Sequence, residues 1–237
     1  MSAVFPLKVS GALTRHKGKV LVGPVDLELD GAGTCVVLGP NGSGKTTLLR
    51  MLHGIARLHG GTINWACGTE AARNAQAFVF QQPVMLRRSV LDNLIYPLRL
   101  RGVPRHEARQ KAGEWAARAG LTGMLEREAT VLSGGERQKL ALARALICDP
   151  ALVFLDEPSA SLDGRATREI EEILTTSSAA GTRFILATHD MGQARRLASR
   201  VIFLLAGKVH ESGPAEAFFA GPITPEARAF LKGDIVE

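Results

Sequence analysis

The chain has 237 residues, of which 46% are hydrophobic, 5% aromatic and 22% charged. This balance is typical of a globular protein and excludes a disordered chain, and the length suits one α/β unit with an appended subdomain, so we expect one core. The longest apolar runs, such as Val201 to Ala206, are far shorter than the ~20 residues that span a bilayer. We therefore expect a soluble protein, with no signal peptide before Phe5.

The cysteines indicate the redox compartment, and the net charge bears on the possible binding partners. Cys35, Cys67 and Cys148 are odd in number and widely spaced, which predicts neither a disulfide framework nor a zinc site and fits a reducing cytosol. The formal net charge is +6, with a pI near 9.6, and this would suit nucleic acid or an anionic membrane surface. Lysines and arginines are scattered among acids, however, so a solvated basic surface is the preferred interpretation.

The first predicted elements are two strands and a strand–loop–helix unit. Val4–Ser10 and Val25–Asp30 alternate apolar and polar residues, which predicts antiparallel strands in a small β subdomain. Thr34–Leu38 is a buried-strand run, followed by a glycine-rich loop and a helical pattern from Lys45 to about His53.

Further buried strands alternate with helices, which predicts a mainly parallel sheet with helices on its faces. The strands are expected at Ala77–Phe80, Ala151–Leu155, Phe184–Ala187 and Val201–Leu205, and the helices at Arg165–Leu174 and Met191–Ala198. From Gly207 we expect a short hairpin and then helices at Ala215–Phe219 and Glu226–Leu231.

The strands stop between Gln81 and Ser133, where Ser89–Leu100 and Arg105–Ala119 are typical of helices. We interpret this stretch as a helical subdomain, approximately residues 83–148, inserted in the α/β core of a single domain that spans residues 1–237.

The glycine-rich loop matches the full phosphate-binding P-loop pattern between a predicted strand and a predicted helix. Small residues let backbone N–H groups converge on phosphate, Lys45 would reach the terminal phosphates, and the Thr46 hydroxyl would ligate Mg²⁺. A plain glycine-rich turn is the alternative. The expected nucleotide-binding residues here are Gly39, Pro40, Asn41, Gly42, Ser43, Gly44, Lys45, Thr46 and Thr47.

Two carboxylates, Asp156 and Glu157, follow the strand Ala151–Leu155, at the end where open α/β sheets bind ligands. Asp156 would hold Mg²⁺, and Glu157 would act as general base toward the attacking water. A strand-end Asp-Glu pair alone would more often be a solvated turn, but the P-loop upstream favours the functional interpretation.

Residues Leu132–Gln138, with the sequence LSGGERQ, resemble the signature sequence of ABC ATPases, which other P-loop families lack. Ser133 offers a hydroxyl, Gly134 and Gly135 allow close backbone approach, and Leu140–Ile147 predicts a helix whose N-terminus faces an anion. An ordinary helix cap is the alternative for this motif taken alone.

Other positions also match the ABC family in order. Gln81 follows the predicted strand that ends at Phe80, Ser161-Leu162-Asp163 resembles the D-loop, and His189 follows the strand Phe184–Ala187. Each would be weak alone, since such residues are more often a surface amide, a helix cap or a structural histidine. The family often stacks an aromatic residue on adenine, and here His16 stands at that place.

The resemblance implies a mechanism in which two copies of the chain sandwich two ATP molecules, each between the P-loop of one copy and the signature of the other. It implies that Lys45, His189 and Glu157 are catalytic, with Glu157 orienting water. It also implies Mg²⁺ ligation by Thr46, Gln81 and Asp156.

The resemblance further implies a membrane permease partner, docked near Pro83–Leu94, and indirectly a soluble solute-binding protein, with no nucleic-acid partner. The alternative is a non-transport ABC ATPase acting on nucleic acid or ribosomes, which the basic pI would suit. Three short segments resemble ATPases of tungstate-type oxyanion importers, and phosphate or amino-acid importers remain alternatives. These segments are Pro83–Val90, Gly192–Ala198 and Pro225–Leu231.

Overall fold

A computed structural model describes residues 4–160, 162–234 and 236. The strands are β1 (Leu7–His16), β2 (Lys19–Leu29), β3 (Thr34–Leu38), β4 (Gly60–Trp65), β5 (Gln76–Val79), β6 (Leu152–Asp156), β7 (Arg183–Ala187), β8 (Arg200–Leu205) and β9 (Lys208–Pro214). The α-helices are α1 (Lys45–His53), α2 (Thr69–Asn74), α3 (Val90–Leu100), α4 (Arg105–Arg118), α5 (Gly134–Leu146), α6 (Gly164–Ala179), α7 (Met191–Leu197), α8 (Ala215–Ala220) and α9 (Pro225–Lys232). Short 3₁₀ helices lie at Thr122–Met124 and Ala129–Val131.

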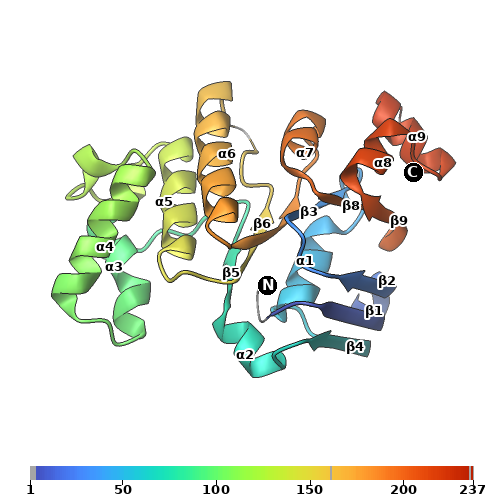
Figure 1. The fold of residues 1–237 in the computed structure, drawn as a ribbon, viewed down its shortest axis with the longest axis horizontal. Coiled ribbons are helices and arrows are strands. Elements are labelled where there is room, and N and C mark those ends of the chain that lie inside the picture. Colours follow the sequence, from blue (N-terminus) through green and yellow to red (C-terminus); the bar gives the residue numbers. More distant parts are fainter. Residues whose placement is uncertain (1–3, 161, 235, 237) are drawn as a thin grey trace.

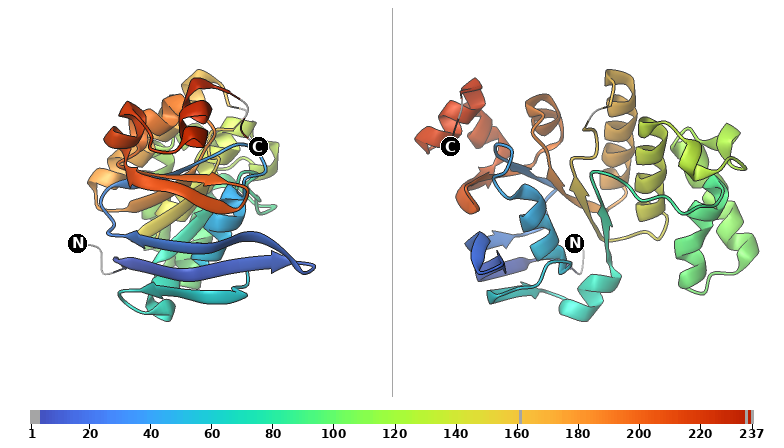
Figure 2. Two further views of the ribbon diagram at one scale, coloured as in Figure 1. Left: turned by 90° about the vertical axis from the view of Figure 1, so that its right-hand side faces the viewer. Right: turned by 180° about the vertical axis from the view of Figure 1, so that it is seen from behind.

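Two sheets organise the described chain (Figure 1). A six-stranded sheet has the order β5-β6-β7-β3-β8-β9, with parallel pairing throughout except at the edge strand β9. A three-stranded antiparallel sheet has the order β2-β1-β4. Figure 2 shows this small sheet on the opposite side of the molecule from α8 and α9. The predicted α/β class, with a mainly parallel sheet and a small antiparallel subdomain, is confirmed.

The six-stranded sheet is buried on both faces, so consecutive residues of its strands feed two different hydrophobic clusters. On β3, Val36 and Leu38 join the cluster under α3 to α9, whereas Cys35 and Val37 join the cluster shared with α1 and the small sheet. The expectation of one core is therefore wrong. The period-two geometry of a strand sends alternate side chains to opposite faces, and each face is covered.

Between β5 and β6 the described chain forms only helices, and α3, α4 and α5 gather at the end of the molecule away from the small sheet (Figure 1). The Ser89 side chain caps α3 by accepting from the Asp92 N–H. This helical insertion agrees with the predicted helices.

The N-terminal hairpin is longer than predicted, since β1 runs to His16 and β2 begins at Lys19. The hydrophobic alternation breaks inside both strands because the register shifts there, and Gly11 and Gly23 adopt positive φ angles of 57° and 108°. The strand β4 and the short helix α2 were not predicted, and their physical signals are weak: Trp65 is the buried residue of β4, and Ala72 is that of α2.

A glycine in β2 offers a test of how closely the hairpin strands pack. A Cβ on Gly23 would lie 2.3 Å from the Ala12 carbonyl oxygen, whereas Gly18, at φ 82°, has open space around it. Gly18→Ala should therefore cost only the left-handed backbone penalty of about 1–2 kcal/mol. Gly23→Ala should cost a further ~1–3 kcal/mol because the backbone must shift. Urea unfolding of the two variants measures the difference in their free energies of unfolding. Equal losses of unfolding free energy would show that β1 and β2 can move apart to accept the new side chain.

Candidate phosphate and carboxylate site

The P-loop connects β3 to α1, as predicted, and its glycines are required by geometry. Gly39 has φ 153°, and a Cβ there would lie 2.0 Å from the Leu204 carbonyl oxygen of β8. Gly44 is the N-cap of α1, at φ 103°, and provides no side-chain cap. The first backbone N–H groups of α1 are therefore left for an external acceptor, which is the arrangement that binds an anion.

The Lys45 ammonium lies inside this loop. Lys45 is 6% exposed, and its Nζ donates to the carbonyl oxygens of Gly39 at 2.8 Å and of Pro40 at 3.0 Å. Burial lowers the pKa of Lys45, while the carboxylates of Glu157 and Asp156 act in the opposite direction. Ser43 is also buried, and its Oγ has no hydrogen-bond partner among the described residues. A phosphate group would offer acceptors to both side chains.

A second pair joins α1 to β6. The Thr46 Oγ1 donates to Asp156 Oδ1 at 2.8 Å, and Thr47 is half-buried on the same turn. Asp156 is 2% exposed, and burial raises its pKa, with the Thr46 hydrogen bond acting against that shift. A hydroxyl and one carboxylate are a donor set that fits Mg²⁺, which uses few protein oxygens and keeps water or phosphate as its other ligands.

Three neighbouring strands bring their predicted polar residues to one point. Glu157 directly follows β6, and its Oε2 lies 3.1 Å from His189 Nδ1 and 3.3 Å from Gln81 Nε2. His189 follows β7, and Gln81 follows β5. Because β5, β6 and β7 are adjacent and parallel, their carboxyl ends meet at the same sheet edge.

The backbone of Glu157 is held in a conformation that few non-glycine residues adopt. Its φ is 48°, and its N–H donates to the Ala187 carbonyl oxygen at 2.9 Å. A left-handed residue costs roughly 1–2 kcal/mol, and such conformations are concentrated at functional sites. Nothing in the local residue pattern signals this strain.

The signature residues begin α5. Ser133 is the N-cap, and it forms a capping box with Glu136: the Ser133 N–H and Oγ each lie 2.7 Å from Glu136 Oε2. These hydrogen bonds lower the pKa of Glu136. A Cβ on Gly135 would lie 3.3 Å from Ala166, so α5 and α6 approach closely here. The helix-cap geometry is therefore present. The N–H groups of Gly134 and Gly135 stand in the first turn of α5, where backbone donors have no intrahelical acceptor.

The signature and the P-loop do not meet within one chain. No hydrogen bond of the described residues joins Ser133, Gly134 or Gly135 to the P-loop. Instead, Gly134 shares a cavity of about 570 Å³ with Gln81 and Leu162. The structure thus brings together only part of the predicted set.

Two further predicted residues lie at the periphery. Asp163 caps α6 through a hydrogen bond from the Ala166 N–H at 2.7 Å, while Ser161 lies outside the described residues. His16 is exposed at the end of β1, paired in register with Lys19. The same hairpin contacts the P-loop, because a Cβ on Gly44 would lie 2.7 Å from Val22 of β2.

Arg50 is a charged neighbour that the sequence patterns did not single out. It lies one helical turn after Thr46 on α1, and its charge acts against the burial that raises the pKa of Asp156. Its guanidinium lies 5.8 Å from the centre of the Phe80 ring, just before Gln81. A single arginine on an exposed helix face carries no signal that distinguishes it from other surface charges.

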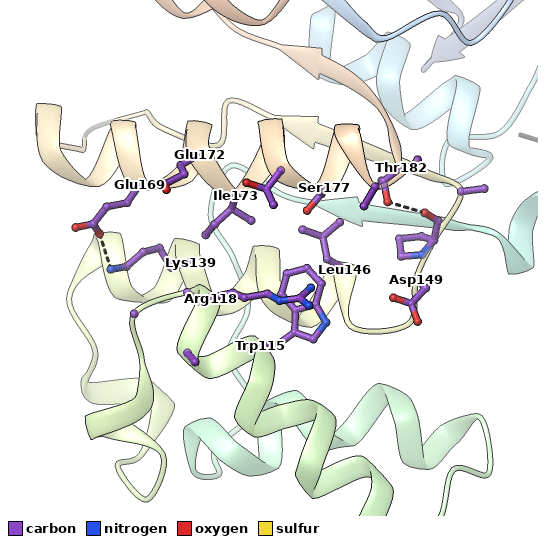
Figure 3. A pocket seen from close by; sticks show the side chains of 18 of the residues that line it. Trp115, Arg118, Lys139, Leu146, Asp149, Glu169, Glu172, Ile173, Ser177 and Thr182 are labelled. Carbon is purple, nitrogen blue, oxygen red and sulfur yellow. Dashed lines mark hydrogen bonds and ion pairs between the residues drawn. The ribbon is translucent and has the colours of Figure 1, made fainter. Parts of the chain in front are cut away.

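A cavity of about 810 Å³ lies elsewhere, between α4, α5 and α6 (Figure 3). Figure 3 shows Trp115 and Arg118 on one side of it, with the guanidinium 5.0 Å from the indole ring centre. Lys139 and Glu169 form an ion pair of 2.7 Å on another side. None of its lining residues belongs to the predicted site, which is built from strand ends and a loop.

The buried charge of Asp156 yields a testable consequence. Because folding raises the pKa of Asp156, its ionised form opposes folding in full above that raised pKa and not below the unfolded value. Asp156→Asn keeps an acceptor for Thr46 but removes the charge, so the ligand-free protein should melt at a higher temperature at pH 7, with a smaller gain at pH 4. Asp163→Asn, at an exposed helix cap, is the matched control and should show no gain. Identical melting temperatures for Asp156→Asn and the parent at pH 7 would contradict this account.

Comparison with known proteins identifies the family. The family described as "ABC transporter" matches residues 22–160. A phosphate import ATP-binding protein of Natronomonas pharaonis is 37% identical over 249 residues, covering 97% of this chain and 87% of the relative. A tungstate uptake system ATP-binding protein of Peptoclostridium acidaminophilum is 36% identical over 216 residues, covering 90% and 99%.

A solved ATP-binding cassette, a dimer in a post-hydrolysis state bound to ADP and Pi, superposes with a TM-score of 0.77 at 25% identity, covering 88% of this chain and 98% of that one. The resemblance noted in the signature residues is thereby confirmed. The chain belongs to the ABC transporter family and is one of its ATP-hydrolysing subunits.

Proposed function

We propose that this subunit hydrolyses MgATP to power a membrane importer of an oxyanion such as tungstate. The observation that carries the catalytic part is the Glu157 carboxylate, held by His189 and Gln81 beside the Thr46–Asp156 pair. A carboxylate that accepts from two oriented donors is fixed in space, and its second oxygen can polarise a water molecule. In this proposal Glu157 is the general base.

The roles of the other residues follow from their charges. Lys45 would release its loop carbonyls and meet the terminal phosphates, together with the N–H groups at the start of α1. His189 binds Glu157 through Nδ1, which leaves Nε2 for a phosphate oxygen. Thr46 and Asp156, with Gln81, would hold Mg²⁺, which when bound neutralises phosphate charge.

A homodimer would complete the site. Ser133, Gly134 and Gly135 lie away from the P-loop of their own chain, and the amides at the start of α5 are positioned for an anion. In a two-fold arrangement, the signature and Asp163 of one copy would face the nucleotide of the other. His16, at the end of the hairpin whose Val22 lies against Gly44 of the P-loop, would stack on adenine.

The permease would dock on residues 83–94, where the structure has a rigid, partly apolar surface. Val84 is 72% exposed. The buried Asn93 side chain bonds backbone groups of Leu86, Arg88 and Ser89. Arg144 of α5 donates to the Val84 carbonyl oxygen at 2.7 Å. A force on this loop would therefore reach the signature helix.

A separate permease is part of the proposal, as is a location on the cytoplasmic face of the membrane. Across the described residues, no helix combines the length and apolarity needed to cross a bilayer. A soluble solute-binding protein would deliver the cargo to the permease. The tungstate and phosphate relatives favour an oxyanion, and phosphate or an amino acid is the alternative cargo.

Substitution of the general base separates binding from chemistry. Glu157→Gln should bind ATP as the parent does and lose nearly all turnover, on the order of 10²–10⁴-fold, because an amide cannot accept the proton. Lys45→Ala should instead weaken ATP binding about 10–100-fold through the loss of a charged hydrogen bond. Glu216→Gln, an exposed carboxylate on α8, is the control. Turnover by Glu157→Gln at the parent rate would remove Glu157 from this role.

The cargo is tested with the assembled transporter. The chain is purified with its co-expressed permease in liposomes, and ATP hydrolysis is measured with tungstate, molybdate, phosphate or amino acids, each with its cognate binding protein. We expect stimulation by tungstate or molybdate. Stimulation by phosphate or an amino acid would change the cargo, and stimulation by nucleic acid without any permease would reject transport.

A further inference from the structure

A partly buried polar cluster joins the segments that carry Glu157 and His189 and is used by none of the roles above. Gln193 of α7 is 0% exposed, and its Nε2 donates to Ser159 Oγ at 2.9 Å and lies 3.5 Å from Glu171 Oε1 of α6. Arg196, one turn further along α7, donates to both oxygens of Glu171 at 2.8 and 2.7 Å. The cluster thus links α6 and α7 to the segment that follows β6.

The cluster connects the segment that follows Glu157 to the segment that follows His189. Ser159 is two residues after Glu157, and Gln193 is four residues after His189. The last ladder connection between these segments is the hydrogen bond from the Glu157 N–H to Ala187, because β6 ends at Asp156 and β7 at Ala187. Beyond the strands, the two segments are joined first by the Glu157–His189 contact itself and then by the Gln193–Ser159 hydrogen bond.

The cluster is poorly explained by stability alone. The Gln193 Oε1 is buried without a hydrogen-bond partner among the described residues, and such a group costs about 1–3 kcal/mol. The amide cannot rotate to exchange its two ends, because Oε1 would then face the Glu171 carboxylate. An apolar side chain of similar size would avoid the unpaired oxygen. What it would lose is the directed hydrogen bond to Ser159 and the longer one to Glu171.

We propose that Gln193 is a positioning residue for ATP hydrolysis, acting through Ser159 to hold Glu157 in register with His189. The inference rests on the proposed roles of Glu157 and His189. Glu157 has a left-handed backbone, so the segment after it needs an anchor to keep its carboxylate 3.1 Å from the imidazole. Gln193 supplies that anchor from the helix that begins directly after the His189 segment.

The test is a double-mutant cycle on steady-state ATP hydrolysis by the purified chain. Gln193→Leu and Ser159→Ala should each lower kcat about tenfold, equivalent to ~1.4 kcal/mol. The KM for ATP should stay within about twofold, because neither side chain contacts the P-loop. The double variant should resemble either single variant, since both remove the same hydrogen bond. Additive losses of about a hundredfold would overturn the proposal.

Controls separate positioning from loss of packing and from failure of the proposed function. Arg195→Gln removes the contact of α7 with the Phe219 ring, 4.6 Å away, without touching Ser159, and should leave kcat unchanged. If it lowers kcat as much as Gln193→Leu, general loosening of α7 is the cause and the proposal fails. Ser159→Ala tests the same contact should Gln193→Leu not fold. Glu157→Gln is measured in parallel, so that loss of the catalytic assignment is seen independently.

Discussion

The site depends on one constraint, the convergence of neighbouring parallel strands at a single sheet edge. β5 and β7 deliver Gln81 and His189 to within hydrogen-bond reach of the Glu157 carboxylate, which follows β6. β3 delivers the P-loop to the same edge, because it pairs with β7. Both faces of this sheet are buried, so its strand ends are held by packing from each side. The remaining contacts refine positions that the sheet has already brought together.

Burial disfavours the charged forms of Lys45 and Asp156 at this sheet edge. The pKa of Lys45 is lowered and that of Asp156 is raised, both chiefly by burial, so each charge is less stable here than in water. Anionic phosphate near Lys45 and a cation near Asp156 would relieve both costs. The signature supplies a second group of amides at the start of α5, and no hydrogen bond of the described residues joins it to the P-loop. The division of these two anion sites is the physical argument for the proposed homodimer.

Prediction from the sequence succeeded where residue type alone dictates conformation and was weaker where contacts do. The P-loop pattern predicted glycine at positions 39 and 44, where the positive φ angles and the close approach of other residues admit no side chain. β4 was missed because its polar–apolar alternation, Thr62 to Trp65, spans only four residues after two glycines. The predicted hairpin strands were too short because Gly11 and Gly23 break their apolar–polar alternation. The single-core expectation failed because it was drawn from chain length alone, whereas the predicted sheet with helices on its faces separates the buried side chains into two clusters.

By itself, the sequence determined the family and the order of most strands and helices, and it predicted which residues carry phosphate-binding and carboxylate chemistry, because these are encoded by residue type at short spacing. Only the tertiary structure decided which of them meet. It placed His189 on Glu157, paired Thr46 with Asp156, and separated Ser133 from the P-loop. It also revealed the strained Glu157 backbone and the Gln193–Ser159 link. These features arise from strand order and packing between segments distant in sequence, which no local pattern specifies.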